Sequence, residues 1–521
     1  MIDTGTKAAL AGRPEGLEQL RELVESALGA LHDAKLKRGG PLPPGGPEAA
    51  VAAVARVLDG DGFLADRPGA RRVTDLFDAY AHWAADLTHP SAVSRMQCAP
   101  TAAAAAAELL AAVLNQSLHS WESGPFALEL ERRLIAEMAS WAGFGEQASG
   151  TLTPGGSISN LMGLLLSRDH ALRNTGGSGS GDVSQSGLVG LGVRPRILCS
   201  AAAHFSIARA AGFLGLGRDA VITVPVDDRG RMLPHEARRI LDGLDADEAP
   251  VALVATAGTT DHGSFDPLPE LAELAADRGI WLHVDAAYGI GALFSPTLAP
   301  LLDGLDRADS IAFDLHKFGW TPASSSVLLV RDEQHLRCLS QQAVYLNPTD
   351  DEAAGFTALL GTSMQTTRRS DAFKIAASLL TLGREGMGAW VDACHDQARY
   401  AAARISAGTD LDLVAEPLLS TVIFRCRPPA GAAPAADASA WNSAWNAAVR
   451  RKLMADGRAL LARTKAPGPD GEPQVHLKLV FLNPATTEED IDDLLADIAA
   501  VARELATAAP GTDGVGSGHG D

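Results

Sequence analysis

The central part of the chain alternates short runs of apolar and β-branched residues with longer stretches of helical periodicity. Two helices are expected first, at residues 102–115 and 126–141. The strands expected after them lie at residues 196–199, 220–226, 251–256, 280–285, 310–314 and 326–330. Because strands that are separated by helices usually pair in parallel, this pattern predicts an α/β fold with a mainly parallel sheet covered on both faces.

The regions on either side of this part differ in pattern, which predicts several domains. Residues 1–100 are interpreted as an N-terminal helical extension, residues 101–370 as the large domain, and residues 371–508 as a small C-terminal α+β domain. The helices expected outside the centre lie at 16–37, 48–57, 74–86 and 372–382, and the strands at 421–425 and 475–481. The Gly-rich tail at 509–521 and a Gly/Ser-rich insertion at 174–187 are expected to be disordered.

Two of the expected strands end in ionisable residues. Asp285 closes the apolar run 281–285, and Lys317 follows the apolar run 310–314. The chemistry of a parallel sheet collects at the carboxyl ends of its strands. An amine and a carboxylate placed there are what pyridoxal 5′-phosphate (PLP) needs, because the lysine binds its aldehyde as a Schiff base and the acid keeps its ring nitrogen protonated. The alternatives are a structural salt bridge for Asp285 and a surface position for Lys317.

Three further motifs are compatible with a phosphorylated ring. Gly156 and Ser157 precede an apolar helical run, so backbone N–H groups at that helix start could bind a phosphate. His204 follows a strand and could lie flat on a ring. Thr256 ends a strand in small residues that let a ring approach the backbone. Each motif also has an ordinary interpretation, as an N-cap turn, a loop histidine and a strand-to-loop turn.

Two residues further along the chain are candidates for contact with a substrate. Tyr345 lies in a predicted loop, where a phenol can act as a general acid, although it could equally be a packing residue. Arg368 carries a guanidinium fork that suits a carboxylate. Its alternative role is an arginine–aspartate pair that fixes the start of a helix.

Taken together, these motifs resemble the group II PLP-dependent amino-acid decarboxylases of fold type I. The resemblance spans about residues 85–505 and depends most on the runs 283–288 and 309–317. It is nearest to the lysine and 2,4-diaminobutyrate decarboxylase subgroup. It implies the aspartate aminotransferase-like fold, with a mainly parallel central sheet, an N-terminal helical segment and a small C-terminal domain.

The resemblance also implies a role for each motif residue. Lys317 would bind the PLP aldehyde, and Asp285 would pair with the ring nitrogen. The residues implied to bind the cofactor are Gly156, Ser157, His204, Thr256, Asp285, Ala287, His316 and Lys317. The residues implied in catalysis are Lys317, Tyr345, His204 and Asp285, with Tyr345 as the donor of a proton to Cα after CO₂ leaves. Arg368 would bind the substrate α-carboxylate.

The implied reaction is decarboxylation of an L-amino acid to its amine and CO₂. The segments 345–347 and 365–374 look closest to the diamino-acid subgroup and favour a diamino acid. Arg95 lies in the segment that matches a substrate pocket, where relatives often have histidine, and His119 stands where they tend to have aspartate. These two departures favour an acidic or polar side chain, so an acidic or aromatic substrate stays an alternative. An oxidase coupled to decarboxylation and a non-catalytic binding protein are further alternatives.

Composition limits the possible binding partners of the protein and the cellular compartments in which it could work. Lys and Arg number 44 against 64 Asp and Glu, and a net charge of −20 argues against nucleic acid and anionic membranes as partners. The five cysteines are scattered without metal-ligand or disulfide spacing, which predicts no metal site and a reduced, cytoplasmic protein. The resemblance implies a homodimer with its active site at the subunit interface.

Overall fold

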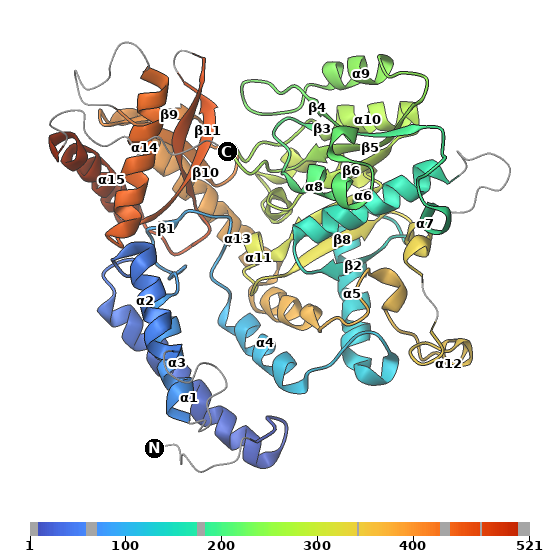
Figure 1. Cartoon of the computed structure of the whole chain (residues 1–521), viewed down its shortest axis with the longest axis horizontal. Coiled ribbons are helices and arrows are strands. Elements are labelled where there is room, and N and C mark those ends of the chain that lie inside the picture. Colours follow the sequence, from blue (N-terminus) through green and yellow to red (C-terminus); the bar gives the residue numbers. More distant parts are fainter. Residues whose placement is uncertain are drawn as a thin grey trace. The chain divides into compact units, whose positions relative to one another are not determined.

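The structure is a computed structural model, and the chain is folded into two compact units (Figure 1). The structure describes residues 9–58, 70–173, 183–340, 343–427, 438–468 and 471–508. The larger unit is Met96–His395, and the smaller unit combines Met1–Arg95 with Asp396–Asp521. The boundaries expected at 100 and 370 stay a prediction, and the tail 509–521 lies outside the described residues.

A seven-stranded sheet forms the centre of the larger unit. Its strands are β2 (Ser149–Thr153), β3 (Arg194–Ser200), β4 (Val221–Val224), β5 (Glu248–Thr256), β6 (Trp281–Asp285), β7 (Ser310–Asp314) and β8 (Ser326–Val330). Their order is β2-β8-β7-β6-β5-β3-β4, and every pair is parallel except the two made by β8. All six strands expected in this region are present, and the predicted α/β fold with a mainly parallel sheet is confirmed.

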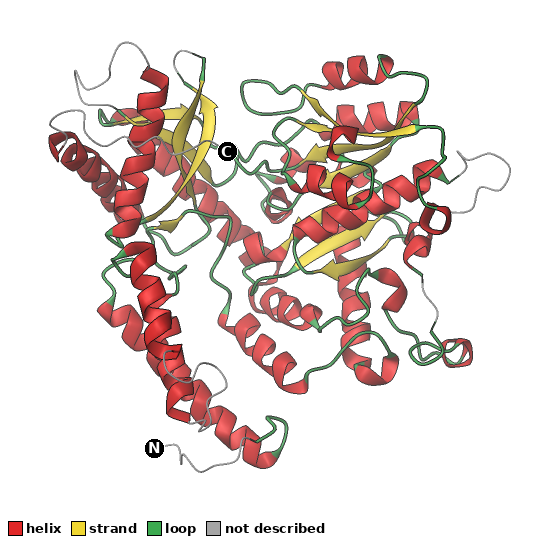
Figure 2. Cartoon of the chain, viewed as in Figure 1, coloured by secondary structure: helices red, strands yellow, loops and turns green. Residues whose placement is uncertain are grey.

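Helices cover the sheet and bury its central strands (Figure 2). Every residue of β6, β7 and β8 is buried, which matches their continuous apolar sequences. Helix α6 (Gly156–Leu172) packs against β5 to β8, and α10 (Leu268–Arg278) packs against β5 and β6. Apolar side chains of α6, α8 (Ser206–Phe213), β3 and β5 share one core cluster. These contacts fix the start of α6 close to the strand ends.

Further helices complete the larger unit. They are α4 (Ala102–Leu114), α5 (Pro125–Trp141), α7 (Val183–Ser186), α9 (Pro234–Asp242), α11 (Leu315–Phe318), α12 (Thr349–Ala353) and the first part of α13 (Asp371–Ala407). The 3₁₀ segments are η1 (Trp121–Ser123), η2 (Arg218–Ala220), η3 (Gly289–Phe294), η4 (Ala299–Leu302), η5 (Leu305–Arg307), η6 (Glu333–Leu339) and η7 (Leu360–Thr362). Helix α13 is interrupted at Gly383, whose φ of 63° is a conformation that favours glycine.

The smaller unit joins the two ends of the chain. Its helices are α1 (Pro14–Lys37), α2 (Gly46–Leu58), α3 (Ala70–Trp83), α14 (Ala438–Ala455) and α15 (Glu488–Ala508). Its five-stranded sheet has the order β1-β11-β12-β10-β9, with β1 (Ala92–Val93), β9 (Leu411–Ala415), β10 (Thr421–Cys426), β11 (Leu460–Pro467) and β12 (Pro473–Val480). Strand β1 pairs in parallel with β11. The N-terminal segment therefore contributes a strand to the C-terminal sheet.

Two features of the larger unit differ from the expectations. Strand β2 was not predicted, because Ser149–Thr153 contains one large apolar residue. Its Gly150 lies so close to β8 that an added Cβ would be 2.3 Å from the Leu328 carbonyl oxygen, so packing rather than propensity selects this strand. Within the insertion expected to be disordered, residues 183–186 form α7, and buried Val183 packs in the core cluster. Residues 174–182 lie outside the described chain.

None of the helices in the described part of the chain is both long enough and apolar enough to cross a lipid bilayer.

Close packing of α6 on β6 gives a first prediction. A Cβ at Gly163 would lie 2.6 Å from Cε1 of His283, so Gly163→Ala should lower the free energy of unfolding by about 1–3 kcal/mol despite its better helix propensity. Gly212→Ala is the matched control, because an added Cβ there meets its nearest neighbour at 3.8 Å. The thermal unfolding midpoint of the cofactor-free protein should fall for the first variant alone. An unchanged midpoint for Gly163→Ala would contradict this packing.

Candidate functional site

A cavity of about 290 Å³ opens at the carboxyl ends of β5, β6 and β7. Thr256 and Asp285 end neighbouring strands in register, and Asp314 ends the next one. All residues predicted to bind the cofactor line this cavity, namely Gly156, Ser157, His204, Thr256, Asp285, Ala287, His316 and Lys317. The remaining lining residues are Pro154, Gly155, Asn160, Gly258, Thr260, Tyr288 and Asp314. The structure therefore brings the predicted amine and the predicted acid into one space.

Lys317 lies on the short helix α11 directly after β7. Its Nζ is 2.9 Å from Oδ2 of Asp314, and its side chain is 18% exposed. The Ser326 hydroxyl also donates to Asp314. Next to the lysine, the His316 Nδ1 is 3.0 Å from the Ser325 carbonyl oxygen, which orients the imidazole. The amine is thus held by an ion pair in a residue that lines the cavity.

Asp285 is 4% exposed and has two hydrogen-bond donors. The Ala287 backbone N–H donates to Oδ1 at 3.1 Å, and the Asn160 amide Nδ2 donates to Oδ2 at 2.8 Å. Among the described residues Asp285 forms no ion pair, although it lies in the same cavity as Lys317. A buried carboxylate with two neutral donors and no cation is suited to a ligand that brings a positive N–H group.

His204 lies in the loop between β3 and α8 and lines the cavity. Its Nδ1 is 2.8 Å from the Ser206 hydroxyl, and the Ser206 backbone N–H donates to the same atom at 3.3 Å. Burial lowers the pKa of His204, so its imidazole is neutral near pH 7. A neutral, flat ring held at one edge is suited to stacking against an aromatic ligand.

The start of α6 forms the anion-binding end of the cavity. Gly155 has a φ of 112°, and Gly156 and Ser157 begin the helix. A Cβ on Gly156 would lie 2.9 Å from Oδ1 of Asp314, so only glycine fits between the helix start and that carboxylate. The first-turn N–H groups and the positive end of the helix dipole face a cavity that also contains Lys317. A phosphate group matches this arrangement.

Thr256 provides an independent observation in favour of a ligand. Its Oγ1 is buried and has no hydrogen-bond partner among the described residues, although Thr256 lines the cavity. Its backbone N–H is fixed by Asp266 at 2.7 Å, and burial raises the pKa of Asp266 to about 6. An orphaned hydroxyl, a buried acid, an amine and a helix start together fit a phosphorylated pyridine with an aldehyde.

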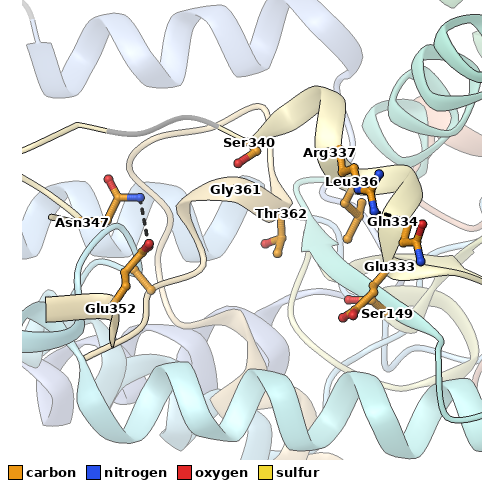
Figure 3. Close-up of a pocket in the computed structure, with 11 residues that line it drawn as sticks. Ser149, Glu333, Gln334, Leu336, Arg337, Ser340, Asn347, Glu352, Gly361 and Thr362 are labelled. Carbon is orange, nitrogen blue, oxygen red and sulfur yellow. Dashed lines mark hydrogen bonds between the residues drawn. The ribbon is translucent and has the colours of Figure 1, made fainter. Parts of the chain in front are cut away.

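Tyr345 does not line this cavity of its own chain. Its side chain is 84% exposed, on a turn in which the Ala343 N–H donates to the Asn347 Oδ1 at 2.9 Å. The Asn347 amide donates in turn to Glu352 at 3.2 Å, beside a second cavity of about 520 Å³ (Figure 3). The role predicted for Tyr345 stays a prediction.

Neither of the two predicted substrate arginines is among the residues that line the Lys317 cavity. Arg368 is buried, donates to Glu131 at 2.8 Å and to the Leu152 carbonyl oxygen at 3.2 Å, and lines a third cavity of about 450 Å³. That cavity and the Lys317 cavity share Pro154. Arg95 is exposed and belongs to the smaller unit. Both assignments to substrate binding stay predictions.

Sequence reasoning gave no role to Asn160 or Asp314. Asn160 follows Gly156 by four residues, so it lies one helical turn beyond the phosphate-type helix start and on the same side. Asp314 ends a strand in the same way as Asp285. The spacing and the strand end were therefore available as signals, but only the structure shows which atoms they contact.

Comparison with known proteins gives consistent matches over most of the chain. A family model described as "Pyridoxal-dependent decarboxylase conserved domain" matches residues 76–427. L-2,4-diaminobutyrate decarboxylase of Rhizobium meliloti (strain 1021) is 40% identical over 420 residues, covering 80% of this chain and 79% of that protein. L-2,4-diaminobutyrate decarboxylase of Acinetobacter baumannii is 33% identical over 422 residues, covering 80% and 81%.

A solved structure resembles the whole chain. It is the glutamate decarboxylase domain of diaminobutyrate-pyruvate transaminase and L-2,4-diaminobutyrate decarboxylase from Vibrio parahaemolyticus. The two structures superpose with a TM-score of 0.80 at 29% sequence identity, over 95% of this chain and 97% of that chain.

The buried imidazole behind the cavity gives a pH prediction. Burial lowers the pKa of His283 to about 4, whereas the unfolded chain takes up this proton near pH 6.5. The unfolded state therefore binds more protons between these values. The corresponding stability, about 3 kcal/mol, is fully present above pH 6.5 and is lost as the pH falls toward 4.

NMR of ¹⁵N-histidine-labelled protein should show His283 neutral from pH 7 down to pH 5, with His283→Gln used for assignment. Titration of this imidazole near pH 6.5 would rule out the burial described for it.

Proposed function

The chain belongs to the pyridoxal-dependent decarboxylase family, and we propose that it releases CO₂ from L-2,4-diaminobutyrate or a close L-diamino acid. PLP is the cofactor of this amino-acid decarboxylase. The observation that carries the proposal is that Lys317, Asp285 and the start of α6 line one cavity. The choice of a diamino acid is supported by the two diaminobutyrate decarboxylases that are 40% and 33% identical to the chain.

Different cavity residues would hold different parts of PLP. When bound, PLP supplies a protonated ring that accepts the electron pair left on Cα as CO₂ departs. Lys317 would hold the aldehyde carbon through Nζ. Asp285 would hold the ring N–H through its carboxylate, which is 4% exposed and therefore interacts strongly with a positive group. The Thr256 hydroxyl, buried without a partner among the described residues, would accept or donate at the ring edge.

The opposite end of the cavity would hold the phosphate. Gly156 and Ser157 offer N–H groups at the start of a 17-residue helix, where an anion is stabilised by the helix dipole. His204 and Ala287 would enclose the ring between them, which excludes water from Cα. Arg368 is proposed as the ligand of the α-carboxylate, because its Nη2 is buried without a partner among the described residues and its cavity shares Pro154 with that of Lys317.

A homodimer accounts for the position of Tyr345. An 84%-exposed phenol outside its own cavity could deliver a proton to Cα in the cavity of a partner subunit. Helices α1, α2 and α3 present apolar side chains to solvent in the single chain, which suits burial in a dimer. The most exposed of them are Leu28, Leu36, Val51, Val54 and Tyr80. All five cysteines are free thiols, which supports a cytoplasmic location.

A substrate screen tests the reaction. CO₂ release should be fastest with L-2,4-diaminobutyrate, with kcat/KM at least about 100-fold above that for L-glutamate or L-tryptophan, because a site that hydrogen-bonds a side-chain ammonium group discriminates strongly against substrates that lack one. Lys317→Ala should abolish release and prevent covalent retention of PLP after borohydride reduction. Lys465→Ala, at an exposed position on β11, should behave like the wild type.

Preference for L-glutamate would instead support the acidic alternative suggested by Arg95 and His119. Stoichiometric oxygen uptake would support the oxidase.

Subunit complementation tests the shared site. Lys317→Ala and Tyr345→Phe should each lose amine formation alone. Co-expressed as a random mixture, they should regain up to about a quarter of the wild-type activity, because one site of each mixed dimer carries neither change. Light scattering should give the mass of two chains.

The control is a mixture of Lys317→Ala with Asp285→Ala, whose changes both lie in the chain's own cavity, so no activity should return. Absence of recovery in the Lys317→Ala and Tyr345→Phe mixture would place Tyr345 with its own chain.

A further inference from the structure

A series of hydrogen bonds between buried side chains leads from Trp281 to Asp285, which lines the cavity. The Trp281 Nε1 is 2.8 Å from the Ser310 hydroxyl, which is 2.8 Å from Nδ1 of His283. The Nε2 of His283 is 3.0 Å from Oδ1 of Asn160, whose Nδ2 is 2.8 Å from Asp285. Ser310, His283 and Asn160 are at most 1% exposed, so water does not compete for these bonds.

The two groups at the ends of this series, the Asp285 carboxylate and the Trp281 indole, determine which partner donates in every hydrogen bond between them. Asp285 as a carboxylate can only accept, so the Asn160 amide must turn Nδ2 toward it and Oδ1 toward His283. His283 then has to donate from Nε2, which leaves Nδ1 as an acceptor for the Ser310 hydroxyl. The Trp281 indole can only donate, and it donates to Ser310 as this direction requires.

A second branch leaves the same amide. The Asn160 Nδ2 also donates to the Ser206 hydroxyl at 2.9 Å, and that hydroxyl is 2.8 Å from Nδ1 of His204. The Ser206 backbone N–H points at the same Nδ1, and it can only donate. The two donors make Nδ1 the bare nitrogen of His204, so its proton is on Nε2. The Asn160 amide thus donates directly to Asp285 and also to the Ser206 hydroxyl that orients His204.

We propose that Asn160 is a positioning residue for the cofactor ring, which holds Asp285 as an anion directed at the ring N–H and keeps the proton of His204 on Nε2. This inference rests on the proposed binding of PLP in the cavity. The amide stabilises a carboxylate that has no cationic partner among the described residues, and it does so without neutralising the charge that a ring N–H requires. His283 and Ser310 act through Asn160 by fixing its orientation.

A binding measurement on the cofactor-free protein tests this role. PLP is compared with its 1-deaza analogue, in which carbon replaces the ring nitrogen. The wild type should prefer PLP, and Asn160→Ala should reduce that preference by about 10- to 100-fold, the range found when an outer hydrogen-bond partner of a metal ligand is removed. Weaker binding of both ligands by the same factor, with the preference intact, would mean that Asn160 only fills space and would overturn the proposal.

Ser167→Ala is the matched control on the same helix, because its buried hydroxyl donates to the Leu164 carbonyl oxygen and has no other bond among the described residues. Its preference should equal that of the wild type. If Asn160→Ala does not fold, two changes at His283 carry the same test. His283→Gln keeps an N–H donor for Asn160 and should keep the preference, whereas His283→Leu should lose it. Equal preferences in the two variants would contradict the proposal.

The binding preferences measured for the Asn160 and His283 variants do not depend on turnover. A protein that binds PLP through its ring nitrogen but releases no CO₂ from any amino acid would refute the proposed reaction and leave the positioning role intact.

Discussion

The burial of the Asp285 carboxylate is the constraint around which the larger unit is arranged. A charge that is 4% exposed at the end of an apolar strand is costly unless donors surround it. The chain meets this requirement with the Ala287 backbone and the Asn160 amide, one from the loop after β6 and one from α6. Helix α6 must therefore pack directly on the strand ends, and that packing also brings its N-terminus to the cavity.

The second buried carboxylate serves the opposite purpose. Asp314 accepts from Lys317 and from Ser326, so its charge is neutralised within the chain. Asp285 and Asp314 end strands that flank the same cavity, yet one is paired with a cation and the other is left for a ligand. In the proposed function, this difference separates an acid that positions the Lys317 amine from an acid that would pair with the ring nitrogen of PLP.

Periodicity and strand-end residues were enough to predict the α/β fold and to pair Asp285 with Lys317, whereas Ala287 and His316 entered the cofactor site only through the family resemblance, and Asn160 and Asp314 were missed. Apolar runs such as Ser310–Asp314 were visible because those strands are buried on both faces. Strand β2 was not visible, because its Gly150 is selected by close packing against Leu328. The contacts of Asn160, the ion pair of Arg368 with Glu131 and the exposure of Tyr345 depend on tertiary positions that a sequence pattern does not encode.

Strand β1 has a consequence for how the chain is made. Ala92 pairs with Leu460, so the N-terminal segment leaves the ribosome long before its partner strand is translated. The larger unit, which is continuous from Met96 to His395, can complete its sheet in the meantime. Helices α1 and α3 can pack on each other during this interval, but β1 has no partner strand until β11 is translated, so its pairing is among the last long-range contacts that the chain can form.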